Sequence, residues 1–524
     1  MELKMLGKAI LLLSAPLWAE TQQAPIHTSS MCSDTEAINA KACYGAKGNL
    51  HIATCSISVG STKLTCSQPQ FTVDAVGMSV YVAEAGDANS SSSLQATIRA
   101  YISPTEATLS TAASSSRTNA HTLWGSDDTA ALQAAYTAAV SEGRALYIPA
   151  GSYLHHGLNW TGNNLKLYGD SYGGTFLFAL AVTNPGKTTQ DAQSTGVDIS
   201  ASGYNEVDHI AFFGGWFGMA DLAPQVNVLG GRIGSNGNGL AIAHIFDGDF
   251  FTTFGPYDVV LFGYEQSSFL NPHFESDAGG ANHGMLYLSA VNTPGIKSPY
   301  RTLVPHTSMT ALSVTGDRSV FGGNGPQVVL DQGPGIDIYS ISIRDTYINL
   351  SSGAFLSDVG TGAIRDVVLD KDNIETGNCL SCQAIEMIGP AWNWQVTSVE
   401  LYANSGPLTD SAYVFKGGFL DGYARVDATG TGGNPEFSAS SCAGSILQLG
   451  QEQPSTNCTD YALASSVSGV LGATVGNTHW TSGTGAPTSA CSVGSIYTNS
   501  GATSANTALY LCYPANTWTP VKVR

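Results

Sequence analysis

The chain has 524 residues, with 21 basic and 40 acidic side chains and a formal net charge of −19 at pH 7. This charge argues against nucleic acid and anionic membrane surfaces as partners, because both repel a strongly acidic protein. Only 12% of the residues are charged and glycine occurs 59 times, a composition typical of a β-rich protein with many tight turns.

Residues 1–19 have the layout of a secretory signal. Lys4 and Lys8 supply a positive start, and the apolar stretch Ala9–Leu13 is too short to span a bilayer. Leu17–Ala19 offers a cleavage site, and no later segment is apolar and long enough for a transmembrane helix. We therefore expect a secreted, extracellular protein that does not interact with a membrane.

The ten cysteines of an exported chain predict disulfide bonds. Pairing of near neighbours suggests Cys32–Cys43, Cys55–Cys66, Cys379–Cys382, Cys442–Cys458 and Cys491–Cys512. The sequence Cys379-Leu-Ser-Cys382 also has the spacing of a redox or zinc motif. No second cysteine pair or histidine cluster accompanies it, so we interpret it as a disulfide-closed loop.

Residues 20–124 form an N-terminal segment that contains an inserted β-module. The stretches Ser61–Cys66 and Met78–Ala83 alternate apolar and polar residues, which predicts strands. A carbohydrate-binding or oligomerising role and a simple end cap are the alternatives for this module.

An amphipathic helix and a strand follow between Ser126 and Gly151. Asp127 and Asp128 can accept hydrogen bonds from the free N–H groups of a helix start, and Gly143 suits its C-terminal end. The apolar face of the helix has helical spacing and comprises Ala131, Leu132, Ala135 and Ala139. We interpret the two aspartates as helix caps rather than as a catalytic pair.

The sequence Gly125-Ser-Asp-Asp-Thr129, its helix and its strand resemble the opening of the pectate-lyase superfamily, and Tyr44–Gly48 resembles the first half of that motif. The resemblance implies an all-β, single-stranded right-handed parallel β-helix related to polygalacturonase-like and phage-tailspike-like polysaccharide-degrading enzymes. The chain has no Arg-x-Pro-x-x-Arg, Asn-Thr-Asp or Gly-His-Gly motif of better-known relatives. The resemblance therefore implies the fold more strongly than the reaction.

Residues 125–440 repeat a pattern of short apolar strands and polar turns. Strands beginning at residues 312, 341, 367 and 399 are separated by 29, 26 and 32 residues, and Ile210–Phe212 shows the same pattern. This period suits one coil of a parallel β-helix, whereas hairpins of a β-sandwich would be more closely spaced. Residues 441–524 form a small disulfide-bonded β-appendage, for which an end cap, substrate adhesion and trimer formation are alternatives.

Carboxylates follow the aligned strand in three consecutive coils. The candidate catalytic residues are Asp317, Asp345, Asp370 and Asp372, and the cations among them are Arg318, Arg344 and Lys371. Neighbouring coils offer the roughly 5 Å carboxylate separation of retaining glycoside hydrolases, and alternate coils approach the roughly 6.5–9.5 Å of inverting ones. Glu275 and Glu375 are further candidates. The alternative is that these aspartates stabilise turns, which Asp favours.

Substrate contacts are expected from Arg318, Arg344, Lys371, Glu275 and two tryptophans. Trp392-Asn-Trp394 would point both rings the same way if the segment were extended, and packing of the loop is the alternative. We predict a polysaccharide as partner, no metal site and no cofactor, and a monomer or a homotrimer. A lyase would need a Lys or Arg base and often Ca²⁺.

Hydrolysis of a polysaccharide in a shallow groove on one face is the favoured interpretation. The alternatives are elimination by a lyase and a non-catalytic adhesin or carbohydrate-binding protein. The sequence names neither the sugar nor the linkage.

Overall fold

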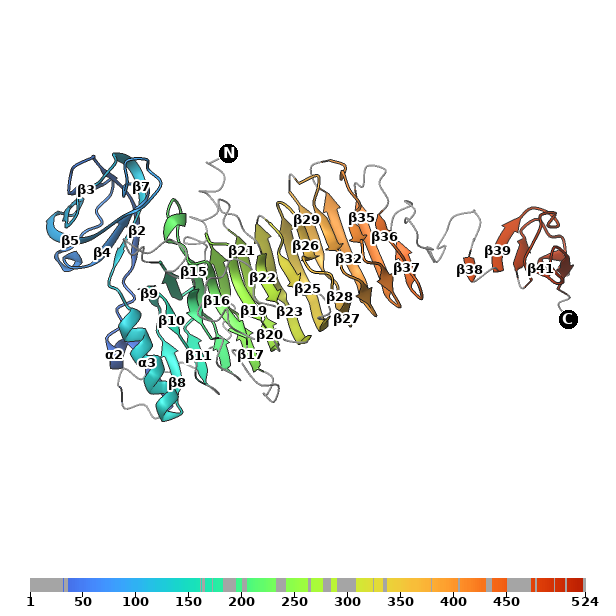
Figure 1. The fold of residues 1–524 in the computed structure, drawn as a ribbon, viewed down its shortest axis with the longest axis horizontal. Coiled ribbons are helices and arrows are strands. Elements are labelled where there is room, and N and C mark those ends of the chain that lie inside the picture. The colour runs from blue at the N-terminus through green and yellow to red at the C-terminus, as the bar shows by residue number, and fades with distance from the viewer. Residues whose placement is uncertain are drawn as a thin grey trace.

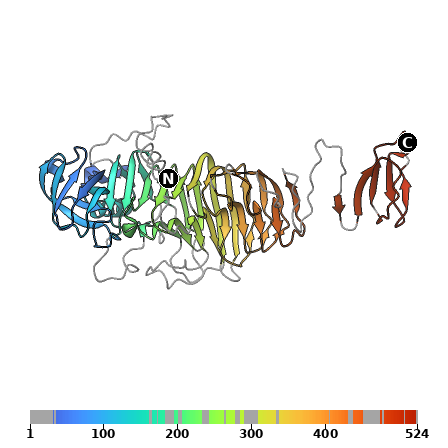
Figure 2. The ribbon, with the colours of Figure 1, turned by 90° about the horizontal axis from the view of Figure 1, so that it is seen from above.

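The computed structural model describes residues 32, 36–160, 162, 165–171, 173–181, 195–199, 205–231, 242–262, 265–276, 284–289, 308–323, 325–332, 337–377, 379–403, 406–429, 436–449, 473–475, 478–493, 495–504 and 507–521. A small barrel lies at one end of a long stack of β-coils, and a separate β-sheet follows at the other end (Figure 1). The view turned by 90° shows the same order along the long axis (Figure 2).

Most coils contribute a first and a second strand to a 21-stranded sheet and a third strand to a 10-stranded sheet, and the pairings between coils are parallel. The first strands are β1 (Ala37–Asn39), β8 (Ala145–Ile148), β11 (Lys166–Gly169), β14 (Asn205–Asp208), β17 (Ile242–Asp247), β20 (Glu265–Leu270), β28 (Val368–Asp370) and β37 (Ile446–Leu449). The second strands are β9 (Gly151–His155), β12 (Thr175–Ala179), β15 (Ala211–Gly214), β18 (Phe250–Thr253), β21 (His273–Ser276) and β29 (Asn373–Thr376). Four longer strands supply both parts of their coil, namely β23 (Ser308–Gly323), β25 (Asp337–Leu350), β32 (Gln395–Ala403) and β35 (Tyr423–Thr429).

Short strands precede the first strand in the later coils, namely β27 (Ile364–Arg365), β31 (Ala391–Trp392) and β34 (Phe419–Leu420). The third strands are β10 (Leu158–Asn159), β13 (Thr195–Asp198), β16 (Val226–Gly231), β19 (Tyr257–Phe262), β22 (Gly284–Ser289), β24 (Val328–Asp331), β26 (Ala354–Asp358), β30 (Gln383–Met387), β33 (Tyr413–Phe415) and β36 (Phe437–Ala439). The chain is therefore a single-stranded right-handed parallel β-helix, and the predicted fold class is confirmed.

A single left-handed residue joins the first and second strands of several coils. The residues at this position have φ between 47° and 58°, and they are His209, Asn271, Asp345, Lys371 and Ser398. Such a residue bends the chain sharply without a loop, so two strands of one coil meet at an angle. Asn and Asp tolerate this conformation best, which explains the polar residues that follow the strands.

Stacked phenylalanines fill the core between neighbouring second strands. Phe212, Phe251, Phe274 and Phe321 are buried in successive coils, with ring centroids 5.3, 5.0 and 4.8 Å apart. Ile348, at the same position of the next coil, is also fully buried. Equivalent inward positions therefore stack along the axis, as parallel in-register pairing requires.

The predicted alignment of the last strand is wrong. Leu312 pairs with Ile341, and Ser342 pairs with Val368, as aligned. The next coil, however, pairs Val368 with Gln395, whereas Val399 lies beyond the turn in the second part of β32. Ile210 likewise adjoins a second strand, β15. Both strands of a coil read as apolar-x-apolar, so the pattern alone does not distinguish them.

Six antiparallel strands close the barrel in the order β2-β3-β6-β5-β4-β7. Their bounds are β2 (His51–Ile57), β3 (Lys63–Cys66), β4 (Ser79–Val82), β5 (Leu94–Ser103), β6 (Glu106–Leu109) and β7 (Arg117–Gly125), with a short 3-10 turn η1 (Val73–Ala75). The barrel has its own core, which includes Leu64, Val80 and Trp124. The segment before it, β1 and the short helix α2 (Ala40–Tyr44), belongs to the β-helix, because β1 pairs with β8.

Only one of the two predicted aspartate caps is present at the start of helix α3 (Thr129–Glu142). Asp127 accepts a hydrogen bond from the Thr129 amide at 3.0 Å, and Gly143 ends the helix with φ of 64°. Asp128 makes no side-chain cap; it accepts from the amides of Lys47 and Gly48 at 2.6 and 2.9 Å. The cap prediction is therefore wrong for Asp128, which joins the two halves of the interrupted opening motif.

Aromatic side chains dock the barrel on the first coils. Trp216 is buried and contacts Phe178 at 5.7 Å between centroids, in a cluster that also holds Tyr81 and Leu123 of the barrel. The turn that carries Trp216 continues into η2 (Ala220–Leu222), where Asp221 accepts hydrogen bonds from the Ser93 amide and hydroxyl at 2.7 and 2.8 Å. The barrel is therefore held by packing and by polar contacts.

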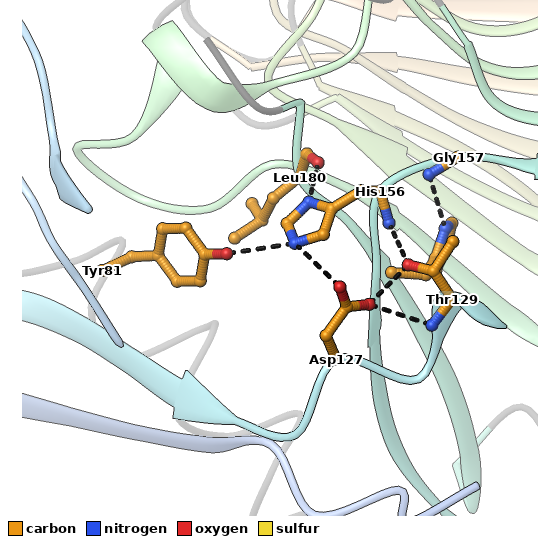
Figure 3. A network of polar contacts seen from close by, with 7 residues as sticks. Tyr81, Asp127, Thr129, His156, Gly157 and Leu180 are labelled. Carbon is orange, nitrogen blue, oxygen red and sulfur yellow. Dashed lines mark hydrogen bonds and ion pairs between the residues drawn. The ribbon is translucent and has the colours of Figure 1, made fainter. Parts of the chain in front are cut away.

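A polar network crosses the same junction (Figure 3). His156 Nδ1 lies 2.6 Å from the Leu180 carbonyl, which can only accept, so this nitrogen carries the proton. His156 Nε2 then accepts from the Tyr81 hydroxyl at 3.1 Å, and Asp127 lies 3.9 Å from the same nitrogen. The barrel is thus tied to the start of the helical stack through one histidine.

The C-terminal sheet is made of β38 (Ala473–Val475), β39 (Thr478–Gly483), β40 (Ile496–Asn499), β41 (Leu509–Cys512) and β42 (Trp518–Pro520). Among the described residues, none of these strands pairs with a coil. Tyr497 contacts Tyr510 and Trp518, with ring centroids 6.1 and 5.8 Å apart, and these rings form the aromatic side of the sheet.

Three of the predicted disulfides are formed: Cys55–Cys66, Cys379–Cys382 and Cys491–Cys512. Cys442 is also disulfide-bonded, whereas Cys458 lies outside the described residues. The predicted Cys32–Cys43 bond is absent and both are free thiols. The two thiols nevertheless lie close together, and burial and a side-chain hydrogen bond with Cys32 raise the pKa of Cys43. Cys43 is held on α2, whereas Cys32 lies in a turn outside any helix or strand.

Residues 1–19, including the proposed signal, lie outside the described part of the chain. None of the helices in the described ranges is long and apolar enough to cross a membrane.

Candidate active site

The turn between first and second strands carries most of the predicted catalytic residues. Asp317 and Arg318 lie within β23, where Gly316–Arg318 stand opposite the single residue Asp345 of the next coil. This is a bulge, and nothing is described of these two side chains. Asp317 therefore lies near the turn, but not at an equivalent position in the ladder.

Arg344, Asp345, Asp370 and Lys371 are brought together by adjacent coils, as predicted. Arg344 pairs in register with Asp370, and Lys371 Nζ lies 3.6 Å from Asp345 Oδ1. The Lys371 and Asp345 side chains are 65% and 44% exposed, so water screens this ion pair and it contributes little stability. Both residues also have the left-handed backbone of the turn, which by itself accounts for an Asp at this position.

Asp372 is buried and serves the fold. Its Oδ1 accepts from the Thr346 amide at 3.2 Å and the Thr346 hydroxyl at 2.5 Å, and only 1% of the residue is exposed. Burial raises the pKa of Asp372 to about 7, an effect that the nearby charges of Asp370 and Asp345 increase. A sugar cannot reach a carboxyl in this position. The prediction of a catalytic role for Asp372 therefore has no geometric support.

The same arrangement occurs four coils toward the N-terminus. Asp249 Oδ1 accepts from the Ile210 amide at 2.7 Å, and this side chain is also buried with its pKa raised well above the usual value by burial. In both places an aspartate satisfies the amide of the residue beside it in the preceding coil. These aspartates stabilise a sharp turn whose backbone cannot complete the parallel ladder.

Trp392 and Trp394 point to opposite sides, contrary to the prediction. Trp394 is fully buried and donates from Nε1 to the Ile364 carbonyl at 2.9 Å. Trp392 is partly exposed, with the Arg365 guanidinium 5.3 Å from its ring centre. The residue between them, Asn393, has φ of 54°, and this left-handed kink breaks the alternation that an extended segment would have. Trp392 remains available for contact with a ligand.

A row of polar side chains, interrupted in one coil by Val320 and Gly322 of β23, lies beside the turn on the outer face of the second strands. Inward residues of these strands are buried, and the residues between them meet solvent. The row, which we call the acidic strip, consists of His273, Glu275, Tyr347, Asn349, Asn373, Glu375, Glu400, Tyr402 and Asp427. From Tyr347 onward the first residue of each coil in this row pairs with the first of the next, and Val320 links His273 to Tyr347, so the strip follows the axis.

The earlier part of the acidic strip couples carboxylates to rings. His273 Nε2 lies 3.6 Å from Glu275 Oε2, and both side chains are about one-third exposed, at 30% and 31%. The Tyr347 hydroxyl donates to Glu375 of the adjacent coil at 2.9 Å. Glu275 and Glu375 are separated by three rungs, or roughly 14 Å, so they do not form a catalytic pair.

Glu400 and Asp427 form the close carboxylate pair of the strip. They are directly in register on β32 and β35, and neighbouring rungs lie about 4.8 Å apart. Both are partly exposed, between buried residues of the same strand. The Tyr402 hydroxyl donates to Glu400. This arrangement brings two carboxylates and one phenol to the same outer surface.

The sequence analysis overlooked this pair. The available signal is a carboxylate between two apolar residues, in Val399-Glu-Leu401 and Val426-Asp-Ala428, because such a residue faces away from the core. The wrong alignment treated the strand of Val399 as a first strand, before the turn. The predicted candidates were therefore the turn aspartates rather than Glu400 and Asp427.

A further carboxyl with a raised pKa lies on the outer side of the 10-stranded sheet. Asp331 accepts from the hydroxyls of Tyr287 and Ser289 at 3.2 and 3.1 Å, and burial raises its pKa. Asp331, Tyr287 and Ser289 are 6%, 4% and 0% exposed, so a polymer cannot reach them as they stand. Within the described residues, no three His, Cys, Asp or Glu side chains are placed to hold a metal ion.

No protein-family model matches this chain, and no curated protein matches it. Among solved structures it is similar to the tailspike protein 2 of bacteriophage CBA120, with 11% identity and a TM-score of 0.32 over 62% of this chain and 41% of the tailspike. The chain thus spans about two-fifths of that protein's length.

Two further similar structures are a family 28 exopolygalacturonase from Yersinia enterocolitica and a GH87 α-1,3-glucanase from Streptomyces thermodiastaticus. The first has 11% identity and a TM-score of 0.33 over 78% of this chain and 97% of that one. The second has 12% identity and a TM-score of 0.30 over 80% and 92%. Identities and TM-scores this low transfer neither a reaction nor a site residue to this chain.

Proposed function

We propose that this protein hydrolyses a polysaccharide that lies along the acidic strip, with Glu400 and Asp427 as its catalytic carboxylates. The observation that carries the proposal is their register: two outward carboxylates face each other on adjacent coils. Their rung spacing of about 4.8 Å is close to the roughly 5–5.5 Å between the carboxyl groups of retaining glycoside hydrolases.

The roles follow from the hydrogen bond of Tyr402. The Tyr402 hydroxyl donates to Glu400 and orients this carboxyl group, so Glu400 is assigned as the nucleophile and Asp427 as the acid and base. Asp427 would first protonate the leaving oxygen while Glu400 attacks the anomeric carbon. It would then take a proton from the water that releases the sugar from Glu400.

The turn residues are assigned a different part. The turn residues lie two or three residues from the strip along the same coils, so we assign polar contacts with sugar hydroxyls at its edge to Arg344, Asp345, Asp370 and Lys371. The disulfides Cys55–Cys66, Cys379–Cys382 and Cys491–Cys512 support export to an oxidising compartment.

The test is incubation of the purified protein with a panel of polysaccharides, following new reducing ends and ultraviolet absorbance together. Hydrolysis yields reducing ends without absorbance, whereas elimination yields an absorbing double bond. Glu400→Gln and Asp427→Asn should each lower kcat by about 10²–10⁴-fold with unchanged circular dichroism. Glu386→Gln, on the other sheet and paired with Lys416, is the matched control and should retain full activity.

Proton NMR of the first product should show a retained anomeric configuration. An absorbing product, or full activity in both Glu400→Gln and Asp427→Asn, would contradict the proposal. An inverted product would rule out the direct pair and the nucleophile assignment.

A further inference from the structure

The outer positions of the second strands change character along the axis. In the first coils they include Phe176, Phe178 and Phe213, which pack in the cluster that docks the barrel. From His273 onward, four carboxylates occupy these positions, namely Glu275, Glu375, Glu400 and Asp427. No Lys or Arg stands at an outer position of any second strand from β9 to the end of β35.

The cations of the coils that carry the strip are placed elsewhere. Arg365, on the short strand β27, is paired with Asp337 of β25 at 2.9 Å. Lys416 is paired with Glu386 of the 10-stranded sheet at 2.6 Å. Lys371 is at the turn with Asp345. The other three cations among the described residues of these coils belong to the first strand or to the bulge at its end, and they are Arg318, Arg344 and Arg425. Lys297 and Arg301 lie outside the described residues.

The opposite flank of the strip is also without cations. The described residues that follow the second strands there are 325–327, 351–353, 377, 379–382, 406–412 and 436, which include Asp410 and Glu436 and no Lys or Arg. A polymer on the strip would therefore meet carboxylates, amides, tyrosines and a histidine. Within the described residues, a sugar carboxylate would meet no Lys or Arg in the strip itself, and Arg344 and Lys371 stand outside it at the turn.

We infer that the substrate is a polysaccharide whose rings carry no acid group, an inference that rests on the proposed function. Hydroxyl groups can donate to Glu275, Glu375 and Asn373, and sugar rings can lie against Tyr347, which is 39% exposed. A uronate polymer would place one negative charge on each ring beside the strip carboxylates, and like charges at such distances repel. The strip therefore selects against polyuronates by repulsion, in addition to its attractive contacts.

The experiment compares the binding of three soluble polymers of similar length to full-length Glu400→Gln protein at low and at high salt. The polymers are an uncharged glucan, a polyuronate and a deacetylated amino-sugar polymer. We expect the polyuronate to bind at least about tenfold more weakly than the better of the other two at low salt, and the gap to narrow at high salt because salt screens repulsion.

Removing one strip charge should act locally. Glu375→Gln should strengthen polyuronate binding several-fold, whereas the control Glu386→Gln, which changes the net charge equally on the other sheet, should not. Binding of the polyuronate as tight as that of the other polymers, or its cleavage by the wild-type protein, would overturn the inference and leave the hydrolase standing. Failure to bind or cleave any sugar polymer would overturn both.

Discussion

Asp372 shows how one buried carboxyl makes stability depend on pH. An exposed Asp loses its proton near pH 4, whereas Asp372 in the folded protein keeps it up to about pH 7. The unfolded chain therefore binds fewer protons between these limits. The contribution of protonated Asp372 to the free energy of unfolding is therefore greatest below about pH 4 and is lost as the pH rises toward about 7.

Asp372→Asn should remove this dependence, because an amide retains an oxygen for Thr346 and cannot ionise. Relative to the wild type, the variant should gain on the order of 1–3 kcal/mol in unfolding free energy between pH 4 and pH 8. Urea unfolding at both pH values measures this gain. The exposed Asp410→Asn, whose charge is not among those that raise the pKa of Asp372, is the control. An equal difference between Asp372→Asn and wild type at both pH values would contradict the prediction.

At the scale of elements, the stacked phenylalanines join successive coils. Phe274 contacts Phe251 and Phe321 at 5.0 and 4.8 Å and is fully buried. Phe274→Ala should destabilise the stack by about 3–5 kcal/mol through lost contacts and the cavity left behind. Because each coil contacts mainly its neighbours, hydrogen exchange should accelerate in β18, β21 and β23 and not in the barrel. Uniform acceleration across the chain would show that the coils do not respond separately.

Asp128 joins two segments separated by the whole barrel. It is 1% exposed and accepts from two amides of the Lys47–Gly48 loop. Asp128→Asn places an NH₂ against one of these donors, which should cost about 1–3 kcal/mol. Asp127→Asn, at an exposed cap, is the comparison and should cost less. Thermal unfolding of both variants measures the difference, and equal losses would contradict the bridging role.

At the scale of the whole molecule, the barrel is a unit with its own core that is docked on the first coils. Trp216→Ala should weaken this docking by about 3–5 kcal/mol, because the ring packs on Phe178 in the cluster that also holds Tyr81 and Leu123 of the barrel. The barrel core around Trp124 should persist. Faster hydrogen exchange at the junction with unchanged exchange in β3 and β6 is the expected result. Tyr81→Phe, which removes one hydrogen bond to His156, should have a smaller effect.

The sequence by itself determined the architecture. Short apolar strands at coil spacing, polar turns, the α3 start with its Gly143 end, and near-neighbour cysteines are local patterns, and local patterns are legible in a chain. They predicted the parallel β-helix, the inserted β-strands around Leu64 and Val80, and three of the disulfides. They also predicted that Asp345, Asp370 and Lys371 lie close together after the aligned strands, as they do at the turn.

Only the tertiary structure decided which carboxylates face solvent together. One left-handed residue, such as Asn393 or Ser398, reverses the side to which the following residues point, and the repeat period does not reveal where it stands. The left-handed Asn393 directs Trp394 into the core. The register between β28 and β32 places Val399 beyond the turn, in the second part of its strand. The pairing of Glu400 with Asp427 and the burial of Asp372 depend on register between coils, and register is set by contacts between residues distant in sequence.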